Sequence, residues 1–419
     1  MLRFVDTATQ SLDPYEEYAP VAQLEHVRTL ARDLRGARIF QLNATSYGGG
    51  VAELLNSLVP LEKGLGLDVK WGVLVAEPAF FALTKRLHNG LQGAPWADVP
   101  PDELAAYLSH NEHVAEEIRG KFDVVIVHDP QPAPVQQFAK DTAARWIWRV
   151  HIDLSAYNRE AWGFLDEYVH EYDAFVFTMP EFVPEQFDHS RVHCFAPAID
   201  PLSPKNLELP SELRDRIVRW TGVQLDRPLL TQVSRFDPWK DPLGVIRVYR
   251  ELRKKHAGLQ LALLGSMALD DPEGWSIFDK ITKDVEGDPD IHVASNFTGI
   301  GNLEVNSFQS ASDVVIQKSI REGFGLIVSE TLWKGTPIVA GRTGGIPMQM
   351  ADGDGGFLVS REEDWVPRID ALLSDRAEAR RIGGLGRERV RKQFLITRLL
   401  EDELGLMASV RSGTQTAHT

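Results

Sequence analysis

Short apolar runs alternate with amphipathic stretches along most of the 419 residues, and this pattern constrains the fold of the chain more than any other feature. Short apolar runs bounded by turn residues are typical of buried strands, whereas apolar residues spaced about 3.6 apart are typical of helices that cover a sheet. Strands and helices that alternate in this way form βαβ units with parallel strands. The sequence therefore predicts an α/β protein.

The pattern falls into two series. In the first, strands are expected at 37–42, 69–75, 123–127, 146–150 and 174–178, and helices over 51–65, 101–119 and 160–170. In the second, strands are expected at 229–233, 259–264, 291–293, 314–317, 336–340 and 357–359, and helices over 242–256, 302–311, 325–334, 362–373 and 376–393. Each series suits one doubly wound, Rossmann-like domain.

The length of the chain and one proline-rich segment predict where the domains divide. A chain of 419 residues is too long for one ordinary core, and the segment 196–210, which is rich in proline, is typical of a linker. We therefore expect domains over 1–199 and 200–395, followed over 396–419 by a C-terminal helix and a disordered polar tail. Ligands of doubly wound sheets bind beyond the carboxyl ends of the strands, which predicts a cleft between the two domains.

Composition excludes several classes of partner and site. A net charge of −15 disfavours nucleic acid and anionic membranes as main partners. The single cysteine, Cys194, excludes an intramolecular disulfide and a cysteine-based zinc site, and we expect it to be buried as a small hydrophobe. No apolar run reaches the roughly 18 residues of a membrane span, and the acidic N-terminus lacks the apolar core of a secretory signal. These features predict a cytoplasmic protein.

The segment 321–330, Arg-Glu-Gly-Phe-Gly-Leu-Ile-Val-Ser-Glu, carries the strongest functional signal. Glu322 opens a Gly-Phe-Gly turn that leads into an expected helix, and Glu330 follows eight positions later. The first N–H groups of a helix have no intrahelical partner and lie at its positive dipole end, so the turn predicts a phosphate-binding site. Eight helical residues span roughly 12 Å, which leaves the two carboxylates to accept hydroxyl groups on either side of the phosphate.

A glycine-rich turn follows the first expected strand of the first domain. Gly49 and Gly50 precede an expected helix, and without side chains they allow the backbone to approach a ligand and donate to an anion. The spacing matches neither a dinucleotide fingerprint nor a Walker loop. A plain tight turn is the alternative.

A basic pair occupies the corresponding position in the second domain. Arg235 and Lys240 lie on a proline-containing loop after the strand at 229–233, and a guanidinium fork with an ammonium group suits two phosphates. In the alternative, both are surface residues bonded to Asp237 and Asp241.

Polar residues also end two strands of the first domain. His151 follows the strand at 146–150, so we expect it to project into the cleft and bond a sugar hydroxyl. His128 and Asp129 end the preceding strand in the same way and are candidates for another part of the wall. The alternative for each histidine is a role in the core.

Two further glycine-rich segments are less specific. The segment 343–347 is typical of a turn, and Asp352 and Asp354 form an Asp-x-Asp string of the kind that holds a metal in some glycosyltransferases. This string lies among glycines before a short strand, which favours a tight turn. No His, Cys and carboxylate cluster has the spacing of a metal site, so we expect no metal.

Taken together, the glycine turn, the basic pair and the Glu-x7-Glu segment resemble a retaining glycosyltransferase of family 4, which has the GT-B fold. The likeness covers both domains. Within the family, the segments at 43–55, 127–134, 148–155 and 317–330 resemble the members that join glucose from a nucleoside diphosphate glucose to free glucose, which gives trehalose reversibly. The resemblance implies two Rossmann-like domains facing across a cleft, with the acceptor side formed by the first domain.

The resemblance also implies roles in donor binding. Gly49 and Gly50 would approach the diphosphate and the reacting sugar. Arg235 and Lys240 would hold the diphosphate and stabilise the leaving group. Glu330 would accept from the ribose hydroxyls.

The remaining implied roles concern the two sugars. Glu322 would accept from donor-sugar hydroxyls, and the backbone of Gly323, Phe324, Gly325 and Leu326 would lie beside the phosphate and the sugar.

On the first domain, His151 would contact the donor sugar, and Asp129 and Asp153 are candidates for facing the acceptor. His151, Arg235, Lys240 and Glu322 are thus the expected catalytic residues.

Three other functions remain open at this point. They are a family member with a different small acceptor, a trehalose phosphorylase, and a sugar-binding protein without catalysis. A binding protein has no need of leaving-group cations such as Arg235 and Lys240, and a phosphorylase has no need of a ribose-binding Glu330. The expected partners are small sugars and the nucleotide sugar as co-substrate, with no cofactor, and a homodimer is left open.

Overall fold

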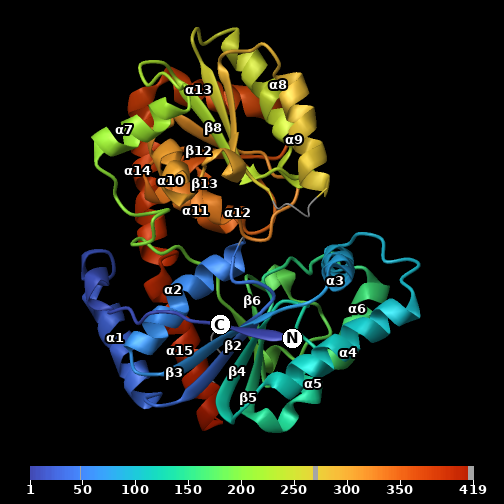
Figure 1. Ribbon diagram of the computed structural model, residues 1–419. Helices are drawn as coiled ribbons and strands as arrows, with labels where there is room; N and C mark the ends of the chain where they lie inside the picture. Colours follow the sequence, from blue (N-terminus) through green and yellow to red (C-terminus); the bar gives the residue numbers. More distant parts are fainter. Residues whose placement is uncertain (48, 268–271, 414–419) are drawn as a thin grey trace. The chain divides into compact units, whose positions relative to one another are not determined.

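The computed structural model of the protein describes residues 1–47, 49–267 and 272–413. The chain divides into two compact units, one made of Met1–Ala198 with Ile396–Thr419, the other of Ile199–Leu395. Each unit contains a seven-stranded sheet with helices on both faces (Figure 1). The predicted α/β class is therefore confirmed.

The sheet of the first unit is parallel apart from one edge strand. Its order is β1-β3-β2-β4-β5-β6-β7, and β1 runs antiparallel to β3. The strands are β1 Leu2–Val5, β2 Arg38–Asn43, β3 Asp68–Leu74, β4 Phe122–His128, β5 Ala143–Arg149, β6 Ala174–Phe177 and β7 Val192–Cys194. His128 is in register with Arg149, so the carboxyl ends of β4 and β5 meet at one edge of the sheet.

Helices cover both faces of this sheet. They are α1 Val21–Asp33, α2 Gly50–Gly64, α3 Pro78–Leu91, α4 Pro101–Glu117, α5 Val135–Phe138, α6 Arg159–Val169 and α15 Ile396–Ser412, with 3-10 helices at Asp13–Glu17, Lys140–Thr142, Pro180–Phe182 and His189–Arg191. The last helix, α15, returns to the first unit and packs on α1, α2, β4 and β5. In Figure 1, α1, α2 and α15 lie on one side of the sheet, and α3, α4, α5 and α6 on the other.

The sheet of the second unit is parallel throughout. Its order is β10-β9-β8-β11-β12-β14-β13. The strands are β8 Leu229–Arg235, β9 Gln260–Ser266, β10 Ile291–Ser295, β11 Val314–Gln317, β12 Ile338–Gly341, β13 Ala351–Asp352 and β14 Gly355–Val359.

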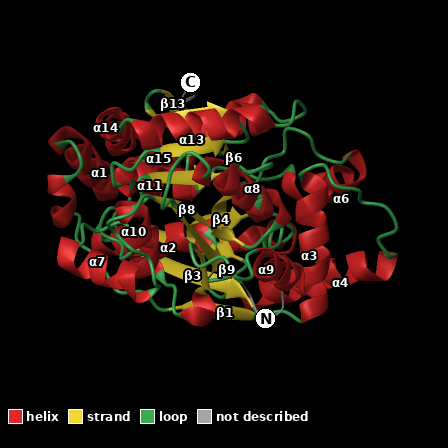
Figure 2. Ribbon diagram, turned by 90° about the horizontal axis from the view of Figure 1, so that it is seen from above, coloured by secondary structure: helices red, strands yellow, loops and turns green. Residues whose placement is uncertain are grey.

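Two apolar cores, one on each face, show that this second unit is doubly wound. On β9, Leu261 and Leu263 pack with α8, α9 and α13, whereas Ala262 and Leu264 pack with α7 and α10. Figure 2 shows α8 and α9 on one side of β8 and β9, and α7 and α10 on the other. The helices are α7 Ser211–Trp220, α8 Pro242–Arg253, α9 Pro272–Asp284, α10 Asn302–Ala311, α11 Leu326–Trp333, α12 Ile346–Gln349, α13 Trp365–Ser374 and α14 Arg376–Gln393, with 3-10 helices at Pro238–Lys240, Asn296–Thr298 and Glu362–Asp364.

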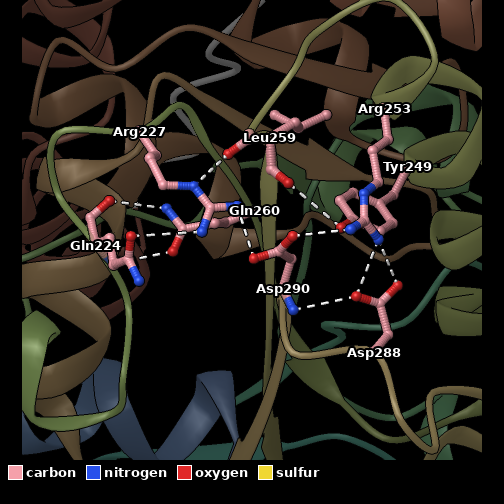
Figure 3. A network of polar contacts seen from close by, with 9 residues as sticks. Gln224, Arg227, Tyr249, Arg253, Leu259, Gln260, Asp288 and Asp290 are labelled. Carbon is pink, nitrogen blue, oxygen red and sulfur yellow. Dashed lines mark hydrogen bonds and ion pairs between the residues drawn. The ribbon is translucent and has the colours of Figure 1, made fainter.

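A polar network ties the amino-terminal ends of β8, β9 and β10 together (Figure 3). Arg227 bonds the Gly258 carbonyl and Asp290, at 2.9 and 2.6 Å. Arg253 bonds Asp288 and Asp290, at 2.9 Å each. Ligands of such sheets bind at the opposite, carboxyl edge. We therefore assign this network to the stability of the fold and not to ligand binding.

Cys194 is exposed, because it lies on the edge strand β7, so its predicted burial was wrong. The proline-rich segment is bonded to the second unit, since Asn206 accepts from the Trp333 indole at 3.1 Å. Ser412 ends α15, and the rest of the expected disordered tail, beyond 413, lies outside the described residues. None of the described helices is long and apolar enough to cross a membrane.

Candidate functional site

The segment 321–330 forms a loop and the first part of α11. Gly325 caps this helix with φ 81° and ψ 65°, a left-handed conformation that favours glycine. Within the described chain, the amide N–H groups of Phe324, Gly325, Leu326 and Ile327 have no protein acceptor. These groups are therefore available to an anion at the positive end of the helix dipole.

The glycine turn at 343–347 supports this loop. A β-carbon on Gly344 would lie 1.6 Å from the Glu322 carbonyl oxygen, and one on Gly345 would lie 2.9 Å from that of Gly323. The Gly345 amide donates to the Gly323 carbonyl at 2.8 Å. Only glycines allow the two backbones to approach so closely, which explains the composition of a segment that the sequence indicated only as a turn.

A buried glutamine fixes the same loop to α11. The Gln349 Nε2 donates to the Phe324 carbonyl at 2.6 Å, and its Oε1 accepts from the Ser329 amide at 2.9 Å and the Ser329 hydroxyl at 2.6 Å. Gln349 is completely buried. Sequence reasoning missed this residue, because nothing near it in the chain distinguishes it from other helical glutamines.

Glu322 and Lys240, two of the predicted site residues, are brought into direct contact. The Lys240 Nζ lies 2.5 Å from the Glu322 Oε2, which also accepts from the Ser319 hydroxyl at 3.1 Å and the Gln317 amide at 3.2 Å. The side chains of Lys240 and Glu322 are only 14% and 12% exposed. Bonds to three donors fix the carboxylate beside the start of α11.

Arg235 does not take part in that contact. Its Nη2 bonds the Asp237 carboxylate at 3.2 Å, and its side chain is 67% exposed. Asp237 also caps the 3-10 helix that ends at Lys240, by accepting from the Trp239 amide at 2.8 Å. In the alternative prediction, Arg235 and Lys240 are surface residues bonded to Asp237 and Asp241. The structure shows the bond between Arg235 and Asp237, whereas Lys240 bonds Glu322 and not Asp241.

Asp241 instead pairs with a lysine that the sequence analysis missed. The Lys318 Nζ lies 2.5 Å from Asp241 and 2.7 Å from Glu362, and its side chain is 7% exposed. Asp241 has φ 43° and caps α8 by accepting from the Gly244 amide at 2.9 Å. Lys318 directly follows β11, so the strand-end rule that indicated Arg235 would also have found it.

Glu330 is placed on the buried face of α11. It is 1% exposed, and its two oxygens contact the Lys205 Nζ and the Gln309 Nε2, each at 3.3 Å. The Lys334 Nζ donates to the Glu330 carbonyl at 2.9 Å, and burial lowers the pKa of Lys334 to about 7. Lys205 lies in the proline-rich segment, for which no candidate site residue was predicted.

The first-unit glycines are exposed. Gly49 has φ 135°, and a β-carbon there would meet no atom within 4 Å. Gly50 begins α2. The glycine before them, at position 48, lies outside the described residues.

His151, His128 and Asp129 are brought together at the carboxyl ends of β4 and β5. The Asp129 carboxylate accepts from the His151 amide at 2.8 Å, and the His128 Nδ1 lies 3.0 Å from the His151 Nε2. His128 is 2% exposed, whereas His151 is half-buried. Burial raises the pKa of Asp129 to about 7, although the His151 amide and Arg149 oppose this, and burial lowers the pKa of both histidines well below the usual value.

A buried ion pair lies under this group. Arg149, the last residue of β5, contacts Glu403 on α15, and both side chains are almost completely buried. Burial lowers the pKa of Arg149 to about 10. The pair links the C-terminal helix to β5, the strand that ends two residues before His151.

The remaining candidates lie apart from these contacts. Asp153 is half-buried, and its carboxylate accepts from the Ser155 amide at 2.8 Å. In the Asp-x-Asp string, Asp352 accepts from the Leu358 amide at 2.8 Å and Asp354 pairs with Arg389 at 2.5 Å. Gly353 has φ 79°, as expected of a tight turn.

Comparison with known proteins matches both units. Residues 41–184 match the family model of the trehalose synthase N-terminal domain, and residues 214–389 match that of glycosyl transferases group 1. The chain is 48% identical to a trehalose synthase of Rubrobacter xylanophilus over 415 residues, which cover 98% of this chain and 99% of that protein. It is 28% identical to a trehalose phosphorylase of Pleurotus pulmonarius, over 90% of this chain but 58% of that protein.

A solved structure shares the fold. The UDP-forming alpha,alpha-trehalose-phosphate synthase of Burkholderia xenovorans, in complex with glucose-6-phosphate, has a TM-score of 0.69 over 89% of this chain and 100% of that chain. The sequence identity is 14%, so this likeness concerns the fold alone. The prediction of two Rossmann-like domains of the GT-B type is confirmed.

Proposed function

Since the chain belongs to the trehalose synthase family of glycosyltransferases, we propose that it moves glucose from a nucleoside diphosphate glucose to free glucose. The product is trehalose, the configuration at the donor carbon is retained, and the reaction is reversible. Relatives along the whole chain support the trehalose-related activity, and the donor, the acceptor and the stereochemistry are the proposed part.

The contact between Lys240 and Glu322 at the start of α11 carries this proposal. The Glu322 carboxylate and the amides of Phe324, Gly325 and Leu326 lie along one short loop, and the Lys240 ammonium group contacts this carboxylate from the loop after β8. The cation and the amides suit a phosphate, and the carboxylate suits the hydroxyl groups of the sugar attached to it. Glu322 would exchange part of its bond to Lys240 for sugar hydroxyls when the donor binds.

The proposed reaction places its charge at this loop. The bond between the donor carbon and the diphosphate oxygen breaks, and its electron pair leaves with the diphosphate. The acceptor oxygen bonds to the donor carbon from the same face, and its proton passes to the departing phosphate oxygen. Negative charge develops on the diphosphate, where Lys240, the exposed Arg235 and the free amides stabilise it more in the transition state than in the ground state.

The first-unit residues are proposed for the sugars. His151 contacts the donor sugar, and Asp129 and Asp153 serve the acceptor. Gly49 and Gly50, exposed and without side chains, suit an approach to the diphosphate.

A trehalose phosphorylase is the second candidate, because such an enzyme matches most of this chain at lower identity. The two functions differ at Glu330, which has a role in donor binding only if the donor contains ribose. In the structure the carboxylate holds Lys205 and Gln309, so the two ribose hydroxyls would have to share or replace these donors.

Calorimetry with a bare nucleoside diphosphate tests the nucleotide part of the proposal. We expect the wild-type chain to bind it, Glu330→Ala to weaken binding about tenfold or more, and Glu322→Ala to leave the affinity nearly unchanged while transfer is lost. One hydrogen-bonded charge is worth ~1.5–3 kcal/mol, which sets the tenfold scale. If the wild-type chain binds no nucleoside diphosphate but cleaves trehalose with phosphate, it is a phosphorylase.

A further inference from the structure

Four polar side chains form a hydrogen-bonded row that leads to His151. The Gln41 Nε2 donates to the Glu62 Oε1 at 3.4 Å, and the Gln41 Oε1 lies 2.8 Å from the His128 Nε2. The row continues through the 3.0 Å contact between the His128 Nδ1 and the His151 Nε2. The two imidazole rings are inclined by only 13°, so the row joins α2, β2, β4 and the end of β5.

Because the row is buried, each of its hydrogen bonds needs a donor on one side and an acceptor on the other. Gln41 and Glu62 are completely buried, and His128 is 2% exposed, so water does not compete for their polar atoms. A buried donor or acceptor without a partner costs about 1–3 kcal/mol. Each polar hydrogen in the row is therefore donated to the acceptor next to it.

The direction follows from the two ends of Gln41. Its amide nitrogen faces Glu62, so its oxygen faces His128 and requires a proton on the His128 Nε2. A neutral histidine carries one ring proton, so the His128 Nδ1 is an acceptor and the His151 Nε2 is the donor to it. The His151 Nδ1 is then left without a proton.

The surrounding charges favour neutral rings. Burial, followed by the charge of Arg149, lowers the pKa of both histidines, and His128 lowers that of His151 further. The other charged groups around the row are Glu62 and Asp129, and burial raises the pKa of both carboxyls. Each of the two imidazole rings therefore carries one proton at neutral pH.

We propose that Gln41 and His128 are positioning residues that fix the tautomer of His151, so that its Nδ1 accepts a hydrogen bond from a sugar hydroxyl. Within the described chain no protein group bonds that nitrogen, and the half-buried ring leaves it accessible. The hydroxyl part of this inference rests on the proposed function. The tautomer itself does not, because the row is present without any sugar.

The test is to read the His151 tautomer by NMR in the full-length protein with ¹⁵N-labelled histidine and no ligand. The two-bond correlations of the ring identify the protonated nitrogen, and His151→Gln assigns the signals. We expect the proton on Nε2 of His151. A proton on Nδ1 would mean that Gln41 is rotated and the row runs in reverse, and it would overturn the proposal whatever the enzyme makes.

Two substitutions of Gln41 then test whether this residue sets the tautomer of His151. Gln41→Met removes the acceptor at similar volume, so we expect His128 to move its proton to Nδ1 and His151 to follow, with the His151 proton found on Nδ1. Gln41→Glu keeps an oxygen facing His128 and should restore the wild-type tautomer. An unchanged His151 tautomer in folded Gln41→Met would show that Gln41 has no positioning role.

Activity gives a further readout. Gln41→Met should lower kcat roughly fivefold to tenfold, the scale of one hydrogen bond, with the affinity for a nucleoside diphosphate unchanged. Gln41→Glu should recover most of the loss. If Gln41→Met changes the tautomer but not kcat, the tautomer assignment stands and the role of the nitrogen in sugar binding is wrong.

Discussion

At the scale of single residues, Lys240 and Arg235, the two cations of the proposed donor site, have different surroundings. Lys240 is mostly buried and contacts Glu322, whereas Arg235 is exposed and, among the described residues, its side chain bonds Asp237 alone. Strand ends were enough to indicate both residues from the sequence. The partners could not be predicted, because Glu322 lies 82 positions from Lys240 and only the packed loop brings the two together.

Lys240→Ala and Arg235→Ala should each lower turnover about 100-fold, the scale of one lost charge-stabilising donor. Both proteins should remain folded, because neither side chain is part of an apolar core. Steady-state kinetics with saturating nucleoside diphosphate glucose gives the measurement. Arg361→Ala, which removes an exposed ion pair on the same unit, is the matched control and should be near wild type. Normal turnover in folded Lys240→Ala would refute the diphosphate assignment.

At the scale of elements, buried strands and the helix after a glycine turn could be predicted well. The expected strand at 314–317 and the helices at 302–311 and 376–393 have the observed bounds. Helix α7 was missed, because most of its ten residues are polar and Val218 is the only one that is fully buried. The contacts of Gln349 and Lys205 were missed for another reason, since only the tertiary fold creates them.

Helix α2 also predicts a pH effect, through Glu62. Burial raises the pKa of Glu62 from 4.5 to about 8 in the folded chain. The folded state therefore binds this proton more tightly than the unfolded state, so stability is full below about pH 4.5, falls as the pH rises from there to about 8, and is constant above it. Glu62→Gln should remove this loss, which is on the order of 3 kcal/mol between about pH 6 and about pH 9.

Denaturant unfolding at about pH 6 and about pH 9 measures the difference, since these values lie on either side of the folded pKa. Glu53→Gln, at an exposed position of the same helix, should keep the wild-type pH dependence. An equal fall in stability for wild type and Glu62→Gln would show that Glu62 is not the group responsible.

At the scale of the whole molecule, two doubly wound units carry different chemistry. The second holds the proposed anion-binding loop and its cation, and the first holds the buried row that ends at His151. The glycine turn, the basic pair and the Glu-x7-Glu segment made the family predictable from the sequence. Composition and spacing alone did not predict the acceptor, because no single residue pattern distinguishes free glucose from another small sugar.

The product of the reaction tests the central proposal most directly. Purified protein is given a nucleoside diphosphate glucose and free glucose, with a chelator present because Arg235 and Lys240 are assigned the charge that a metal would otherwise supply. NMR of the anomeric signals should show a non-reducing disaccharide with an α,α-1,1 linkage. A reducing disaccharide, an inverted linkage, or transfer only to another acceptor would contradict the proposed trehalose synthesis.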